Sequence, residues 1–324
     1  MNSASKSSSI SSLSTRSAPP LVGPHSPSTL TSICRKWREL ALATPKLWRS
    51  ISLLSNFDQR QTSFPQGVIV DMWLSRSRCC PLSLSIDDYS DGVYDHLSRT
   101  DIIPLLVPHR ARWEHLNLRL ITRDGFIQGA MPLLRHLNLT GSNNPVILAP
   151  HDVPQLRTVV LSGAVVAKVT LLWAQLTCLT LRFALLSQCV PILLQAPNLV
   201  RCELWNVQET LDSDPYPDIT LPHLELFVLK DHTVPGMMSG LLGACIVPAL
   251  RTLEVTDQFF GRNSIESLKS FVSTSGCQLQ EIRITTNADP NNFRETLRAA
   301  FPSIPNVFFI DKSRISWTWP SLHH

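Results

Sequence analysis

A short apolar pattern recurs from Trp113 onward and limits the folds that this chain can adopt. The pattern is apolar-x-x-apolar-x-apolar, and it occurs eight times. A repeat of this length is one supersecondary unit, which buries its apolar face only by stacking on its neighbours. The units begin 21, 22, 20, 23, 25, 26 and 29 residues apart, at Trp113, Leu134, Leu156, Leu176, Leu199, Leu224, Leu250 and Leu279.

The pattern and its period are those of leucine-rich repeats. In such a unit the fourth and sixth positions point inward from a short strand, and the first position anchors the turn into it. We therefore expect an α/β fold, an irregular leucine-rich-repeat solenoid over residues 66–310 with parallel strands on its concave face. Helical spacing and alternation predict helices over 68–76, about 95–107, 187–196, 264–273 and 292–301, and strands over 82–86 and 307–310.

Side chains that alternate with the inward positions are predicted to face the concave side in two columns. The first column contains Asn117, Asn138, Val160, Thr180, Glu203, Val228, Glu254 and Arg283. The second contains Arg119, Thr140, Ser162, Arg182, Trp205, Lys230, Thr256 and Thr285. Tryptophan beside arginine is typical of binding hot spots, so we predict a protein-binding site. Its residues are Arg182, Arg201, Glu203, Trp205 and Lys230. The alternative is that Trp205 packs on a neighbouring loop.

The region before the repeats divides into two parts. Residues 1–29 are rich in Ser and Pro and are expected to be disordered, because they bury too little apolar surface to offset the entropy of ordering. A Ser-rich, acid-poor start also resembles an organelle import signal, which is the alternative. Over residues 30–55, Ile33, Trp37 and Leu40 fall at helical spacing and predict one apolar face, and Thr44-Pro45 predicts a break.

Two segments resemble F-box proteins, in particular the large fungal group in which an F-box precedes irregular leucine-rich repeats. Residues 33–41 and 44–48 are similar to the second half of the F-box, and residues 73–84 are similar to the helix-to-strand passage that follows. The resemblance implies a substrate receptor and not an enzyme. The F-box of the family binds the Skp-type adaptor of a cullin–RING ubiquitin ligase, and the repeats hold a protein substrate. Residues that match the adaptor-facing and core positions are Ile33, Cys34, Trp37, Leu40, Pro45, Leu47 and Trp48.

The chain departs from that family at the start of the F-box. The family opens with a Leu-Pro-x-Glu helix, and a Ser-rich tract stands in its place here. Two interpretations therefore stay open: a receptor whose partial F-box binds the adaptor, and a leucine-rich-repeat scaffold with no ligase link, whose F-box remnant caps the solenoid. At the other end, the segment that leads into the tail (residues 311–324) is the candidate C-terminal cap.

Other classes of site have little support in the sequence. No GxSxG, GxGxxG, GxxxxGK[ST] or HExxH motif occurs, so we expect neither catalysis nor a cofactor. The eight cysteines form no CxxC pair, which favours reduced thiols over zinc ligands or disulfides. His115 and His136 occupy the same position in adjacent repeats and are expected to stand about 5 Å apart.

Charge and hydropathy give no support to two further partner classes. The formal net charge of +4 is too small to imply nucleic-acid binding. No apolar run approaches the roughly 18–20 residues that a membrane span needs. We therefore expect a cytoplasmic or nuclear protein whose partners are proteins, with no metal, nucleic acid or membrane bound.

Overall fold

The computed structural model describes most of the chain. The described residues are Pro19, Leu21, Gly23 and the ranges 25–53, 66–87, 102–119, 127–141, 145–208, 216–230, 239–256, 264–286 and 291–311. Expectations for residues 1–18, for the first part of the helix at about 95–107 and for the tail beyond 311 lie outside them.

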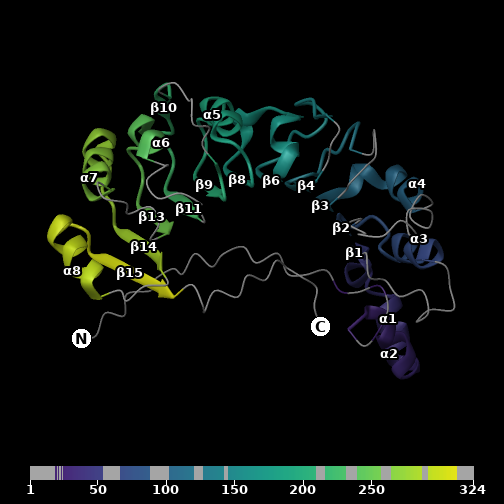
Figure 1. Cartoon of the computed structure of the whole chain (residues 1–324). Coiled ribbons are helices and arrows are strands. Elements are labelled where there is room, and N and C mark those ends of the chain that lie inside the picture. Colours follow the sequence, from purple (N-terminus) through teal and green to yellow (C-terminus); the bar gives the residue numbers. More distant parts are fainter. Residues whose placement is uncertain are drawn as a thin grey trace, which may run out of the picture.

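Helices and strands alternate along the described chain (Figure 1). The α-helices are α1 (Pro27–Ile33), α2 (Arg35–Leu42), α3 (Gln66–Arg76), α4 (Ile102–Leu106), α5 (Leu186–Leu194), α6 (Ser239–Ala244), α7 (Ser264–Ser275) and α8 (Asn291–Ala300). Short 3-10 helices are η1 (Pro45–Trp48), η3 (Val107–Arg112), η4 (Gly163–Ala167) and η5 (Trp173–Gln175). From residue 66 onward, the described residues contain every helix and strand that the sequence predicts within them, with ends shifted by a few residues.

Eleven of the described strands form one sheet in which every neighbouring pair is parallel. The strands follow one another in chain order: β1 (Ser50–Leu53), β2 (Leu82–Asp87), β3 (Trp113–Arg119), β4 (His136–Thr140), β6 (Thr158–Ser162), β8 (Cys178–Arg182), β9 (Arg201–Trp205), β11 (Leu226–Lys230), β13 (Thr252–Thr256), β14 (Glu281–Thr286) and β15 (Asn306–Asp311). In Figure 1 the strands line the inner side of an arc and the helices lie on its outer side. The protein is therefore an α/β protein with one long parallel sheet.

Two further pairs of short strands lie outside the main sheet. They are β5 (Val146–Ile147) with β7 (Val169–Thr170), and β10 (Ile219–Thr220) with β12 (Cys245–Ile246). Both pairs are parallel, and each joins the connections of neighbouring repeat units.

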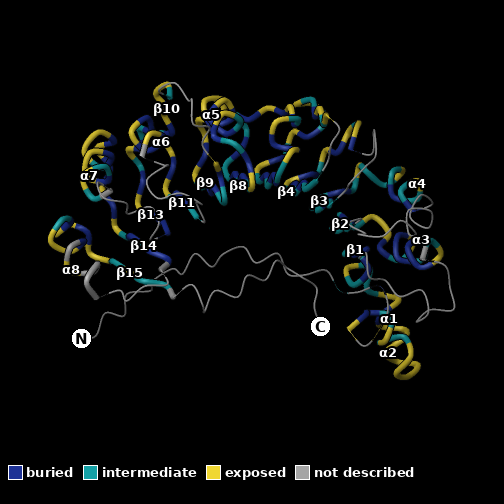
Figure 2. The backbone as a smooth tube through the Cα atoms, in the orientation of Figure 1, coloured by how far each residue is buried: buried dark blue, intermediate teal, exposed yellow. Residues whose placement is uncertain are grey.

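The core lies between the sheet and the outer helices. The three apolar positions of every repeat unit are buried, from Trp113, Leu116 and Leu118 in the first unit to Leu279, Ile282 and Ile284 in the last. Burial alternates along strands such as β2 and β4, because successive side chains point to opposite faces. Figure 2 shows exposed residues along outer helices such as α7, and buried and half-buried residues along the strands.

Prolines set the turn that enters five of the repeat strands. Each lies two positions before the first Leu of its unit, at Pro132, Pro154, Pro197, Pro222 and Pro248. In the unit that starts at Leu134, the Leu134 N–H donates to the carbonyl of Met131 at 3.0 Å, and the other four units repeat this bond. Proline suits the second position of such a turn because its φ is already near the required value.

The N-terminal unit begins earlier than predicted. Helix α1 starts at Pro27, within the segment 1–29 that was expected to be disordered. Ser26 explains this start, because its side chain accepts a hydrogen bond from the Ser28 N–H and proline follows at the first helical position. Leu21 is also buried. The expected disorder of the residues just before 30 was therefore wrong.

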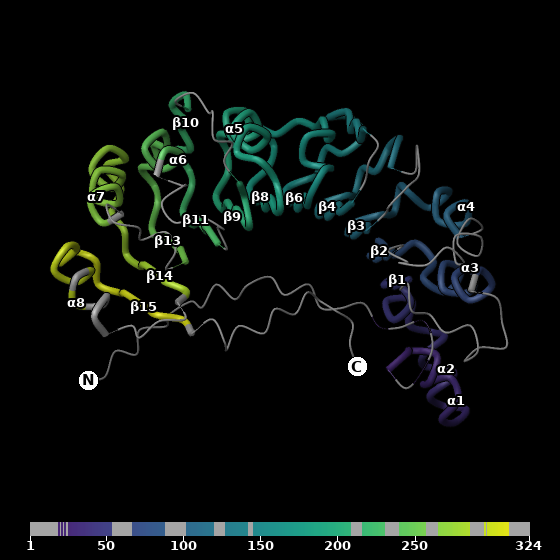
Figure 3. Tube along the Cα trace, viewed as in Figure 1, coloured from purple at the N-terminus to yellow at the C-terminus, as the bar shows by residue number. Residues whose placement is uncertain are grey.

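Cys34 divides the predicted N-terminal helix in two. Its backbone is extended, with φ −158° and ψ 172°, so that α1 ends at Ile33 and α2 begins at Arg35. Ile33 therefore does not share one helix with Trp37 and Leu40, as their spacing predicted. Figure 3 shows this helical pair at one end of the arc and α8 with β15 at the other.

Candidate protein-binding surfaces

Large apolar side chains are exposed on helices α1 and α2. Ile33 is 58% exposed, Trp37 46% and Leu40 56%, and Leu42 is exposed as well. We call these four residues the hairpin surface. The two helices pack against each other, so the exposed side chains belong to one small unit. Several exposed apolar residues on one small unit are a mark of an interaction site.

Trp48 attaches this helical unit to the rest of the protein. Its ring is fully buried, and its Nε1–H donates to the Ala41 carbonyl at 2.9 Å. The ring meets Trp73 of α3 edge-on, with centroids 5.4 Å apart, and the Arg76 guanidinium lies 4.5 Å from its centroid. Trp48 is therefore a core residue, and a partner protein would not reach it.

The seven predicted adaptor residues thus fall into two groups. The exposed group contains Ile33, Cys34, Trp37 and Leu40. The structural group contains Pro45, which begins η1, Leu47, which packs on the core, and Trp48. Only the first group is available to a partner.

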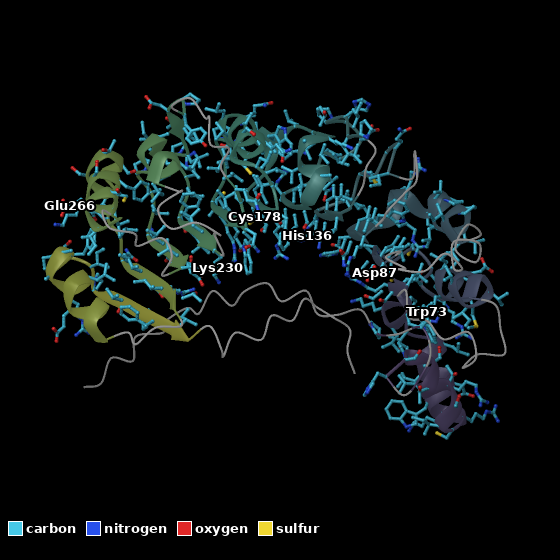
Figure 4. The ribbon with its side chains drawn as sticks, in the orientation of Figure 1. Trp73, Asp87, His136, Cys178, Lys230 and Glu266 are labelled. Carbon is cyan, nitrogen blue, oxygen red and sulfur yellow. The ribbon has the colours of Figure 1, made fainter. Side chains whose placement is uncertain are left out.

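The five residues of the predicted binding site on the strands lie together. We call Arg182, Arg201, Glu203, Trp205 and Lys230 the Trp205 cluster. In the sheet register Arg182 pairs with Trp205, and Trp205 pairs with Lys230. The Arg182 guanidinium and the Lys230 ammonium lie 4.8 and 4.9 Å from the Trp205 ring centroid. Each is a cation–π contact. Figure 4 shows Lys230 on the inner side of the arc, where the site was predicted.

Glu203 holds the other side of this cluster. Its carboxylate accepts hydrogen bonds from Arg201 Nε at 2.6 Å and from Trp205 Nε1 at 3.0 Å. Glu203 is buried, although its column was predicted to face a partner. Val228 and Glu254 of the same column are buried too. For Glu203 the reason is that its two donors fold over it, so it positions the cluster and does not offer its carboxylate to a ligand.

The Trp205 cluster continues into charged residues that lie outside the predicted site. Lys230 pairs with Glu254 at 2.7 Å, and Arg283 lies 3.9 Å from Glu254 and 2.6 Å from Glu281. Glu254 and Arg283 occupy the column of Glu203 on β13 and β14, and this shared column is the signal that could have identified them.

Arg182 differs from the other cations of the inner face near it. Among the described residues no carboxylate oxygen lies within 4.0 Å of its guanidinium, whereas Arg201, Lys230 and Arg283 each have such a partner. Burial lowers the pKa of Arg182, and the more distant Glu203 opposes that shift. Its Nε has no hydrogen-bond acceptor among the described residues. Arg182 is therefore a partly desolvated cation that an added carboxylate would stabilise.

Other kinds of site have no support within the described ranges. Their His, Cys, Asp and Glu residues form no group of three or more that could hold a metal ion. None of the described helices has the length and apolar character needed to cross a bilayer.

Compared with known proteins, the sequence matches no family model and no curated protein. The two surfaces are therefore the basis on which a function is inferred.

Proposed function

We propose that this protein is a substrate receptor of a cullin–RING ubiquitin ligase. The hairpin surface binds a Skp-type adaptor, and the inner face of a leucine-rich-repeat solenoid binds the protein to be ubiquitinated. This function assigns binding to the chain and leaves the chemical step to other subunits.

The solenoid part of the proposal is supported by repetition at three levels. The repeat spacing and the parallel register recur from unit to unit, and the proline turn recurs in five of the units. A sheet whose strands follow chain order, with each unit contacting its neighbours, is the architecture of stacked repeats. Such stacks present an extended inner surface, and here that surface carries the Trp205 cluster.

The exposure pattern of the helical unit is the observation that carries the ligase link. Trp48 and Ala41 are buried and fix the unit, whereas Ile33, Trp37 and Leu40 are left facing outward. All of these positions lie in the segment that resembles the second half of an F-box. A helical unit that is anchored by buried residues and also exposes large apolar side chains is suited to receive a partner helix or subunit.

A repeat scaffold with no ligase link is the second candidate. The contact of Trp48 with Trp73 favours it, because it joins the helical unit to the core beneath the first strands of the sheet. A solenoid needs such a cap whether or not the cap binds an adaptor. In that case the hairpin surface serves another protein or none.

Capture of purified Skp-type adaptor by the full chain separates the two candidates. A Trp37→Ala, Leu40→Ala variant is expected to lose about tenfold or more in affinity, the size of effect given by hot-spot residues. The matched control is Leu172→Ala, Leu194→Ala, which removes two comparably exposed apolar side chains elsewhere. Equal capture of all three chains contradicts the hairpin site. Absence of capture by the folded wild-type chain favours the scaffold.

A further inference from the structure

Four neighbouring strands of the sheet end in the same backbone conformation. The residue directly after β4, β6, β8 and β9 has a positive φ, at Gly141 (76°), Gly163 (77°), Phe183 (51°) and Asn206 (50°). After β8 and β9 this residue continues the ladder, because the Phe183 N–H donates to the Trp205 carbonyl and the Asn206 N–H to the Lys230 carbonyl, both at 2.9 Å.

Phe183 does not suit this conformation. Glycine has no Cβ to clash at positive φ, and asparagine tolerates it better than most residues, whereas a bulky aromatic side chain there is an outlier. Burial does not compensate Phe183, since its side chain is 54% exposed. An exposed aromatic residue held in a strained backbone position points to a role in binding and not in the stability of the fold.

Phe183 stands next to Arg182, whose guanidinium has no carboxylate oxygen within 4.0 Å among the described residues. It directly follows Arg182, and its backbone is bonded to that of Trp205. The rim of the β8 strand therefore offers an aromatic side chain and a guanidinium without a carboxylate within reach among the described residues. An acidic group beside an apolar group would satisfy both.

We propose that Arg182 and Phe183 anchor an acidic segment of a partner protein. Arg182 takes a carboxylate of that segment, and Phe183 packs against the apolar side chain next to it. The inference rests on the proposed role of the inner face as a binding surface, and it adds the chemistry of the segment that is bound.

The charges nearby favour a protein segment over a nucleic acid. Glu203, Glu254 and Glu281 lie on the strands that follow β8 in the sheet. These carboxylates already neutralise Arg201, Lys230 and Arg283, so a polyanion laid along the inner face would gain little from those cations. A segment with one or two acidic residues needs only the Arg182 end. Nucleic-acid binding is accordingly tested as a separate outcome.

Selection from a displayed library of random twelve-residue peptides on the purified full chain tests the proposal. Enriched peptides are expected to carry Asp or Glu within two positions of an aromatic or aliphatic residue. Synthetic copies are then titrated against Phe183→Asn and Arg182→Gln, and each variant is expected to bind about tenfold more weakly. Phe183→Tyr is expected to keep the affinity. Leu172→Ala and Arg251→Gln, at exposed positions elsewhere, are the matched controls.

Thermal unfolding keeps a structural effect apart from a binding effect. Phe183→Asn places after β8 the residue type that Asn206 provides after β9, at nearly the same positive φ. The melting temperature of this variant is therefore expected to equal or exceed that of the wild type. The proposal is overturned if no acidic peptide is enriched on the folded chain, or if the variants bind selected peptides as the wild type does. Binding of a labelled single-stranded RNA that needs Arg182 and Phe183 also overturns it. Adaptor capture measured on the same preparation reports separately on the hairpin surface.

Discussion

The imidazole rings of His115 and His136 are stacked, with centroids 4.4 Å apart and planes 8° from parallel. The two residues pair in the register of β3 and β4. Burial is the largest cause that lowers the pKa of each from the ordinary value of 6.5, while Glu114 acts in the opposite direction. Two charged rings at this distance would repel each other, so the stack favours neutral imidazoles.

The stack predicts that stability falls in mild acid. Because the folded-state pKa values are lowered, the unfolded chain binds protons more readily, and the free energy of unfolding decreases as the pH drops below about 6.5. Urea unfolding at pH 7.5, 6.5 and 5.5 measures this slope. A His136→Asn variant is expected to show a shallower dependence, with His109, whose pKa burial also lowers, contributing equally to both chains. Equal slopes would contradict the prediction.

Two tryptophans of the helical unit are expected to respond differently to truncation. Trp48→Ala removes a fully buried ring and its hydrogen bond to Ala41, and should lower the free energy of unfolding by about 3–5 kcal/mol. Trp37→Ala removes a half-exposed ring and should change it by no more than about 0.5 kcal/mol. Chemical denaturation checks both values. A large loss with Trp37→Ala would place that side chain in the core and not on the hairpin surface.

Removing one partner of the Lys230–Glu254 ion pair is expected to destabilise the fold more than replacing both partners with apolar residues. Their side chains are only 11% and 12% exposed. Among the described residues, Lys230→Ala leaves Glu254 with Arg283, 3.9 Å away, as its remaining cation, and should destabilise the fold by about 3–5 kcal/mol. The double variant Lys230→Met, Glu254→Leu removes both charges and should recover most of that loss. Unfolding curves of the three chains measure it, and a double variant no more stable than Lys230→Ala would refute this account.

The cysteines are expected to separate by reactivity. Cys34 and Cys79 are exposed, and Cys189, Cys202, Cys245 and Cys277 are buried. Burial raises the pKa of Cys189 and Cys245 to about 12, so their thiolates are scarce at neutral pH. A thiol reagent should therefore modify Cys34 and Cys79 first and leave the four buried thiols unmodified until denaturant is added. A Cys34→Ser, Cys79→Ser variant should lose the fast phase, and its persistence would count against the assignment.

The spacing of apolar residues was enough to predict most of the fold. Leu134, Leu137 and Leu139 specify a strand and its buried face because the three positions lie within six residues of one another. The same local signal places Arg182 beside Trp205 and Trp205 beside Lys230, since identical positions of successive units fall into register. The columns of the inner face were therefore confirmed as register columns.

The N-terminal unit shows where local spacing was insufficient. Ile33, Trp37 and Leu40 fit one helical face, yet the extended backbone at Cys34 divides them between two helices. Trp37 and Trp48 are the same residue type in one short segment. Trp48 is buried because it packs on Trp73 and the rest of the core, whereas Trp37 stays 46% exposed.

The sequence by itself determined the repeat, its strands and the side of the sheet on which each side chain lies, because these follow from residues a few positions apart. Only the tertiary structure decided which of those side chains a partner can reach. Glu203 is covered by Arg201 and Trp205, Lys230 is paired with Glu254, and Arg182 has no carboxylate within 4.0 Å among the described residues. Burial and ion pairing depend on side chains of separate strands, which meet only after the sheet has formed.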